Sequence, residues 1–328
     1  GGLVAGLLAH YFAKEAKGAG VSEVMNAMIT RQGVIRPRVG IVKALASAFT
    51  IGSGGSAGSE GPIIQIGAAL GSTVGQIFRF SETNLKTLIA CGAAAGISAI
   101  FNTPIAGVLF ALEVILGDFT IAAFTPVVVS SVFAAVVAQG YYGDHPVFAV
   151  PDYRFAGAFE LGWYLVLALF AGIVGVLFIK VCYAVEDFFN DGVTWMPDWS
   201  KPAFGGLLVG GIGLQYPEVM GVGYETIGAA LKGDLLLPAL RILLFFKLLS
   251  TPLTIGSGGS GGFFAPSLFI GASLGGAFGT LGARLFPGVI SSPGAFALVG
   301  MGAVVAATTH APLTAMLIIF EMTGSYHI

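Results

Sequence analysis

Charged residues are scarce in this sequence. Only 10% of its 328 residues are Asp, Glu, Lys or Arg, whereas 55% are hydrophobic. Soluble domains carry about 25% charged residues, because charges cover the surface that faces water. The net charge is −2, which provides no basic surface for nucleic acid. The composition predicts an integral protein of the plasma or inner membrane, surrounded by lipid and without a nucleic-acid partner.

Cysteines and metal-binding patterns are also scarce. The two cysteines, Cys91 and Cys182, lie in apolar stretches, where cysteine packs as a small hydrophobic residue. The four histidines lack the spacing of metal ligands, so we expect no metal, cofactor or catalytic residue. An intramembrane protease, with Ser53 or Ser257 as nucleophile and His310 as base, is an alternative of a different class. Because the GSGGS segment that would carry the serine occurs twice, an enzyme is disfavoured.

Long stretches without any charge are present instead. A helix needs roughly 20 apolar residues to cross a bilayer. The charge-free stretches are Thr87–Leu112, Phe119–Gly143, Leu161–Ile179, Leu248–Ala283 and Leu285–Phe320. The chain also contains 50 glycines, which allow close helix contacts but also break helices. Since broken helices at membrane depth line cavities, the pattern indicates an all-α transporter or channel rather than a simple anchor.

The sequence contains an internal repeat. Ile51–Gly71 and Ile255–Gly275 are identical at 13 of 21 positions, at an offset of 204 residues. Lys43 and Lys247 lie at the same offset. A second pair of segments matches at an offset of 208, with the following aligned residues: Gly92 and Gly300, Pro104 and Pro312, Glu113 and Glu321. The chain is therefore predicted to be two related halves.

The first membrane repeat is expected to cover residues 1–150 and the second residues 155–328. Gln139–Phe155, which is polar and contains prolines, is typical of a linker between them. Repeats in transporters are commonly inverted, with the binding site at their interface. Because the chain begins within an apolar run, both of its ends are expected to be truncated.

Each half contains a Gly/Ser-rich loop followed by a proline and an apolar segment. Proline is favoured in the first turn of a helix, so helices are expected to begin near Pro62 and Pro266. The unpaired N–H groups and the helix dipole at such a start attract anions. Neither loop contains Lys or Arg, so a bound anion would not be held too tightly to pass. Two opposed helix starts could thus form an anion pathway.

The two loops differ at one position, where the first has Glu60 and the second has Phe264. A carboxylate at a helix start can itself occupy the anion site, and protonation would leave the site free. An ionisable residue inside a membrane indicates function, so Glu60 is the candidate gate. Glu113 and Glu321 end apolar segments at matching positions, which favours a structural role for both.

These motifs resemble those of the CLC family of chloride channels and chloride/proton exchangers. The residues Gly58-Ser59-Glu60-Gly61-Pro62 are similar to its G-[K/R]-E-G-P motif. The residues Gly262-Phe263-Phe264-Ala265-Pro266 match its G-x-F-x-P motif. The residues Gly18-Ala19-Gly20-Val21-Ser22-Glu23 resemble a divergent G-S-G-I-P-E. The order and spacing of the three motifs agree with the family over nearly the whole chain.

The resemblance implies tilted, broken helices in two inverted repeats and a homodimer with one pore per subunit. It implies that Glu60 is the gating glutamate and that small inorganic anions, with chloride as the substrate, bind near the three loops. The expected anion-binding residues are Gly18, Ala19, Gly20, Ser59, Gly61, Gly262, Phe263, Phe264 and Ala265. Ala19 stands where the family usually has serine, so one hydroxyl ligand is absent.

The family's exchangers have a proton-carrying glutamate directly after the position of Glu113. Here that residue is Val114, as in many of the family's channels. The sequence therefore favours a chloride channel gated by Glu60, with a chloride/proton antiporter as the alternative.

Overall fold

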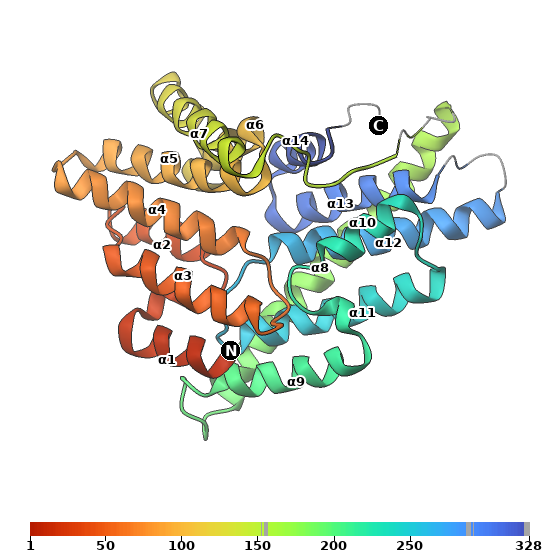
Figure 1. Ribbon diagram of the computed structural model, residues 1–328, viewed down its shortest axis with the longest axis horizontal. Coiled ribbons are helices and arrows are strands. Elements are labelled where there is room, and N and C mark those ends of the chain that lie inside the picture. The colour runs from red at the N-terminus through yellow and green to blue at the C-terminus, as the bar shows by residue number, and fades with distance from the viewer. Residues whose placement is uncertain (152, 154–156, 287–289, 291, 325–328) are drawn as a thin grey trace.

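The computed structural model describes all residues except 152, 154–156, 287–289, 291 and 325–328. Its described residues form helices joined by short loops, with two isolated β-bridges. The N-terminal half and the C-terminal half lie side by side (Figure 1), and α6 of the first half adjoins α14 of the second. The architecture is thus all-helical, as the sequence predicts.

The first half contains seven α-helices and two other helical turns. They are α1 (Gly2–Phe12), η1 (Lys14–Ala16), α2 (Val21–Thr30), α3 (Pro37–Gly52), α4 (Glu60–Ile77), α5 (Glu82–Phe101), α6 (Pro104–Phe110), η2 (Ala111–Leu116) and α7 (Ile121–Tyr142). The η2 segment is a π-helical continuation of α6. Such π-helical turns are rare and occur frequently at functional sites. Because α7 continues to Tyr142, the connection between the halves begins at Gly143, later than the sequence suggests.

The second half repeats most of this order. It contains α8 (Ala158–Asp187), η3 (Phe188–Gly192), α9 (Lys201–Gln215), η4 (Pro217–Val219), α10 (Tyr224–Lys232), α11 (Leu237–Gly256), α12 (Phe264–Leu285), α13 (Pro293–Thr309) and α14 (Pro312–Thr323). The sequence offsets make α9 to α14 the equivalents of α1 to α6. Equivalent helices therefore surround the centre from both halves.

Equivalent residues of the two halves bond to each other reciprocally. Gly58 N–H donates to Gly262 O at 2.8 Å, and Gly262 N–H donates to Gly58 O at 2.6 Å. Likewise, Ser56 N–H donates to Thr254 Oγ1, and Ser260 N–H donates to Thr50 Oγ1. Reciprocal bonds between equivalent positions require a two-fold axis between the halves. Such an axis relates the repeats of many transporters, and that the repeats are inverted in the membrane stays a prediction.

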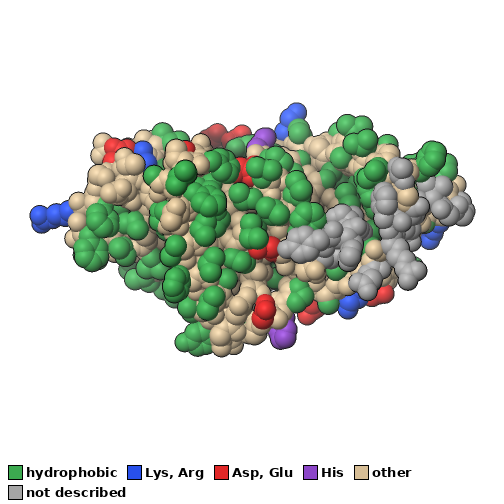
Figure 2. Space-filling model, turned by 90° about the horizontal axis from the view of Figure 1, so that it is seen from above, with side chains coloured by type: hydrophobic (Ala, Val, Ile, Leu, Met, Phe, Trp, Pro, Cys, Tyr) green, Lys and Arg blue, Asp and Glu red, His purple; other side chains and the backbone are tan. Residues whose placement is uncertain are grey.

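Among the described residues, five helices are long and apolar enough to cross a membrane. They are Glu82–Phe101, Ile121–Tyr142, Phe159–Gly192, Leu237–Gly256 and Phe264–Leu285. The most apolar parts of α7 and α8 are only 28% and 22% buried, whereas that of α12 is 72% buried. Figure 2 shows hydrophobic side chains spread over the edge formed by α6, α7 and α14, with few charges between them. Thus α7 and α8 lie at the surface of the molecule and α12 lies in its centre.

The two central helices begin slightly earlier than the sequence predicts. α4 begins at Glu60 and α12 at Phe264, two residues before Pro62 and Pro266. The preceding residues, Ser59 and Phe263, already have helical backbone angles, so the proline is the third residue of each helix. A proline is tolerated there because first-turn N–H groups have no partner within the helix. Glu60 therefore belongs to the helix itself.

Candidate functional site

Three glycine-rich loops meet at the interface between the two halves. Besides the Gly58–Gly262 pair, Gly18 N–H donates to Gly259 O at 3.0 Å, and Gly261 N–H donates to Gly18 O at 3.2 Å. The backbone of Gly61 packs directly on Ala19, since an added Cβ on Gly61 would lie 2.0 Å from Ala19 O. These contacts bring the starts of α2, α4 and α12 together. The N–H groups and positive dipole ends of three helices thus converge.

Glycine is required at two places in this arrangement. Gly20 has a φ of +94°, a conformation that side chains strongly disfavour. At Gly58, an added Cβ would lie 1.8 Å from Oε2 of Glu60. The missing side chain of Gly58 therefore leaves the space that the Glu60 carboxylate fills.

Glu60 is fully buried, and its carboxylate reaches across to the other half of the protein. Oε2 accepts a hydrogen bond from the backbone N–H of Ala265, the second residue of α12, at 3.4 Å. Oε1 accepts a hydrogen bond from the hydroxyl of Tyr224 at 3.0 Å. A negative group at a helix start is electrostatically favourable. The carboxylate therefore lies where a small anion would bind at the start of α12.

Two buried lysines stand behind the loops, one in each half. Lys43 Nζ donates to Gly18 O at 2.7 Å and to Ala16 O at 3.2 Å. Lys247 Nζ makes the equivalent bonds to two carbonyls, Gly221 O at 2.9 Å and Val219 O at 3.0 Å. Each lysine thereby fixes the loop that leads into α2 or α10. The sequence shows that the two lysines occupy matching positions, but it does not show that they bind the carbonyl oxygens of these loops.

The residues expected to bind anions lie together in these loops and the first turns that follow. Gly18, Ala19 and Gly20 precede α2, and Ser59 and Phe263 immediately precede α4 and α12. Gly61, Phe264 and Ala265 belong to the first turns, and Gly262 forms the β-bridge with Gly58. They are therefore brought together where the loops meet, but their contact with an anion stays a prediction.

Glu113 and Glu321 have the structural role that the sequence favoured. The carboxylate of Glu113 accepts hydrogen bonds from the first turn of α14, and that of Glu321 accepts them from the first turn of α6. Val114, which follows Glu113, is a half-buried residue that packs against the main core. No group of three or more His, Cys, Asp and Glu in the described residues is arranged to hold a metal.

Tyr224 was not singled out from the sequence, although it contacts Glu60 directly. A signal was present, because Gly221-Val222-Gly223 repeats the glycine spacing of Gly18-Ala19-Gly20. The structure shows that both segments lead into a helix and are held by an equivalent lysine. A search for glycine pairs as well as for longer motifs would have found this fourth helix start.

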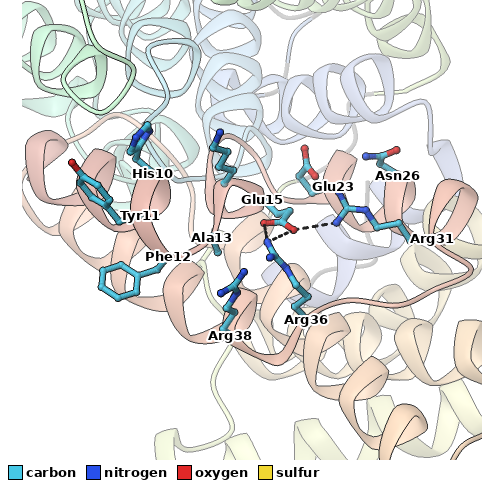
Figure 3. Close-up of a pocket in the computed structure, with 11 residues that line it drawn as sticks. His10, Tyr11, Phe12, Ala13, Glu15, Glu23, Asn26, Arg31, Arg36 and Arg38 are labelled. Atoms are coloured by element: carbon cyan, nitrogen blue, oxygen red, sulfur yellow. Dashed lines mark hydrogen bonds and ion pairs between the residues drawn. The ribbon is translucent and has the colours of Figure 1, made fainter.

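Two cavities lie along the equivalent helices α2 and α10. One, of about 550 Å³, contains Lys14, Arg31, Arg36 and Arg38 together with Glu15 and Glu23 (Figure 3). The other, of about 390 Å³, is lined by Phe148, Tyr224, Glu225, Lys232 and Asp234, among others. The two cavities thus lie beside equivalent helices of the two halves.

The larger cavity carries an excess of basic side chains at its mouth. Figure 3 shows Glu15 between Arg31 and Arg36, to which it is joined by ion pairs. Burial raises the pKa of Glu15, but hydrogen bonds from its own backbone and from Arg36 and Arg31 outweigh this effect. The pKa of Glu15 therefore lies below its ordinary value. Glu15 stays ionised and orders two of the arginines, while Arg38 and Lys14 lie beside them.

Comparisons with known proteins extend this picture. The family model described as voltage gated chloride channel matches residues 1–328. A protein of Ralstonia nicotianae that is named as a ClcB-like chloride channel protein is 39% identical over 332 residues, which cover 100% of this chain and 77% of the relative. The H⁺/Cl⁻ exchange transporter ClcA of Vibrio cholerae is 37% identical over 331 residues, which cover 98% of this chain and 70% of the relative.

Solved structures show the same fold. The crystal structure of a slow cyanobacterial Cl⁻/H⁺ antiporter matches 99% of this chain and 77% of that one, with a TM-score of 0.86 and 27% identity. A CLC-type fluoride/proton antiporter matches 98% of this chain and 79% of that one, with a TM-score of 0.85 and 24% identity. The chain is thus a multi-pass integral membrane protein that belongs to the voltage-gated chloride channel (CLC) family of anion transport proteins.

Proposed function

We propose that this protein exchanges chloride for protons across its membrane, with Glu60 as the group that competes with chloride and carries the proton. The V. cholerae relative is named an H⁺/Cl⁻ exchange transporter, and the cyanobacterial structure is that of a Cl⁻/H⁺ antiporter. These relatives favour the exchanger over the channel that Val114 suggests from the sequence. The intramembrane protease is set aside, because the family transports anions and is not a family of enzymes.

The position of Glu60 carries this proposal. Its carboxylate is completely buried and accepts a hydrogen bond from Ala265 N–H at the start of α12. An ionised carboxylate there excludes an anion from the same N–H group. A proton would neutralise the carboxylate and weaken its attraction to the helix start, so that chloride could replace it. Chloride movement and proton uptake are thereby linked through one side chain.

The surrounding groups suit a passing anion. The loops offer backbone N–H groups rather than a direct Lys or Arg contact, so binding is weak enough to allow release. The cavity along α2 contains four basic and two acidic residues at its wall, which raises the local concentration of anions. The cavity along α10 reaches Tyr224, beside Glu60. We propose that these cavities are the two entrances to the pathway.

The experiment is a liposome assay with the purified full-length protein. An imposed chloride gradient should drive protons in the opposite direction, against their own gradient, and internal pH would be recorded together with chloride efflux. The matched control, Glu60→Gln, should still move chloride but no protons. Chloride efflux with no proton movement in the wild type would contradict exchange, and absence of any anion flux would contradict the transport role.

A chloride channel gated by Glu60 is the second candidate function. The observation that favours it is Val114, which offers no carboxylate for a second proton-transfer step and packs against the core instead. The preceding Glu113 is occupied by its hydrogen bonds to α14. The same liposome assay separates the two candidates, because a channel would dissipate the chloride gradient without moving protons.

We further propose that the protein works as a homodimer with one pathway per subunit, as the resemblance to the family implies. Ile105 of α6 and Leu313 and Met316 of α14 are exposed hydrophobic residues on neighbouring helices, which suits a contact between two copies. Cross-linking of the full-length protein in liposomes should yield a dimer. A monomer that transports at the full rate would contradict this assembly.

A further inference from the structure

Tyr224 holds one oxygen of the candidate gate. Its hydroxyl donates to Oε1 of Glu60 at 3.0 Å, while the other oxygen faces Ala265 N–H. The tyrosine ring packs edge-on against Phe148, with 5.5 Å between the ring centres. The two carboxylate oxygens are therefore held by different elements, α10 and α12. The contact with Ala265 uses a backbone N–H at a helix start, where an anion would bind, whereas the contact with Tyr224 uses a side-chain hydroxyl.

The loop before Tyr224 is rigidly placed. Lys247 Nζ binds the carbonyl oxygens of Gly221 and Val219, and its ammonium group lies 4.8 Å from the centre of the Phe269 ring. An added Cβ on Gly223 would lie 2.6 Å from that ring. Since Tyr224 follows Gly223 directly, these contacts fix where its side chain leaves the backbone. The fold therefore holds the Tyr224 hydroxyl at a fixed place beside Glu60.

The two-fold equivalents of Glu60 and Tyr224 are both apolar residues. The equivalent of Glu60 in the other half is Phe264, and the equivalent of Tyr224, aligned by the glycines and lysines, is Val21. Phe264 and Val21 both belong to the main hydrophobic core or pack against it. Both pairs span the two halves, because Glu60 and Val21 belong to the first half and Tyr224 and Phe264 to the second. One position is therefore a hydrogen-bonded polar pair, whereas its two-fold equivalent is apolar. The halves diverged at both partners of the same contact.

We propose that Tyr224 is a positioning residue that latches the ionised form of Glu60 in the anion site and so sets the pH at which transport rises. A hydroxyl bonds a carboxylate more strongly than it bonds a neutral carboxylic acid, so the latch weakens when Glu60 takes up a proton. Lys247, which holds the loop before Tyr224, is a buried charged group that interacts electrostatically with Glu60. Tyr224 also lines the cavity along α10, which would let protons approach the pair from that side.

The test is Tyr224→Phe, which removes the hydroxyl and keeps the ring. Chloride efflux from liposomes would be measured from pH 4 to pH 8. Because the ionised, docked carboxylate loses its donor, the midpoint of the flux should move to higher pH by about one unit. The matched control is Tyr153→Phe, which removes the buried hydrogen bond that the Tyr153 hydroxyl donates to Leu231 O of α10 and leaves the Glu60 contacts in place. Its midpoint should equal that of the wild type.

The inference rests on the proposed function of Glu60, and the two can fail separately. If Glu60→Gln abolishes the pH response while Tyr224→Phe leaves the midpoint unchanged, the latch is wrong and the gate stands. An equal shift in Tyr153→Phe would also overturn the latch, because it would reflect a general loosening of α10. A wild type with no pH response would overturn the gate and the latch together. In a Glu60→Gln background, Tyr224→Phe should have no further effect.

Discussion

Glu113 and Thr314 are joined across the two halves of the protein. The Glu113 carboxylate accepts hydrogen bonds from the backbone N–H of Thr314 at 2.9 Å and from its hydroxyl at 2.7 Å. The equivalent Glu321 accepts hydrogen bonds from Ile105 N–H at 3.1 Å and Ala106 N–H at 2.7 Å. Each half thus caps a helix of the other, satisfying N–H groups that would otherwise lack partners inside a membrane.

These caps predict a loss of stability in Glu113→Ala. The substitution removes charge-assisted hydrogen bonds, so the free energy of unfolding should fall by about 1.5–3 kcal/mol. Glu113→Gln should lose less, because its amide oxygen still accepts a hydrogen bond. Thermal unfolding of the detergent-solubilised protein measures both effects, with the exposed Glu218→Ala as a control. If Glu113→Ala unfolded at the wild-type temperature, the caps would carry no stability.

Lys43 is predicted to support anion binding through the loop that it holds. In Lys43→Met the carbonyls of Ala16 and Gly18 lose their donor, so the N–H groups before α2 are no longer fixed. We expect the affinity for chloride to fall about tenfold, which corresponds to about 1.4 kcal/mol. Isothermal titration of the purified protein measures it, and Lys180→Met on the exposed side of α8 is the control. Equal affinities would show that the Gly18–Gly20 loop does not contribute.

Ala19 is predicted to influence the choice between anions. Ala19→Ser adds a hydroxyl donor beside Gly61, where the loop before α2 meets α4. Chloride is more strongly hydrated than nitrate and gains more from an added donor, so the chloride/nitrate flux ratio should rise several-fold. The ratio is measured with liposomes loaded with either anion, and Ser22→Ala at an exposed position is the control. An unchanged ratio would place Ala19 away from the pathway.

The parts of the fold that sequence could predict are those written in local patterns. The charge-free stretches predicted most of the membrane helices, and the repeat of Ile51–Gly71 in Ile255–Gly275 predicted the equivalent α4 and α12. Glycine, proline and a lone glutamate at a helix start were enough to single out Glu60. The exact helix start was missed, because the backbone of Ser59 is already helical and proline is tolerated in the third position.

The contacts around Glu60 could not be predicted, because they depend on how distant segments meet. Tyr224 is 164 residues away from Glu60 in the chain, and nothing local to either residue indicates the other. Lys43 and Lys247 appeared as isolated charges in apolar helices, and their carbonyl partners became visible only in three dimensions. The choice between channel and exchanger also depends on distant segments. It requires that protons can reach Glu60, and the residue type at position 114 alone does not show this.

The most direct test asks whether Glu60 and an anion compete for one place at the start of α12. Crystals of the full-length wild type and of Glu60→Ala would be soaked in bromide and examined by anomalous scattering. We expect a bromide peak within hydrogen-bond distance of Ala265 N–H in Glu60→Ala and none there in the wild type. Identical peaks in both proteins, or no peak at Ala265 in either, would contradict the gate.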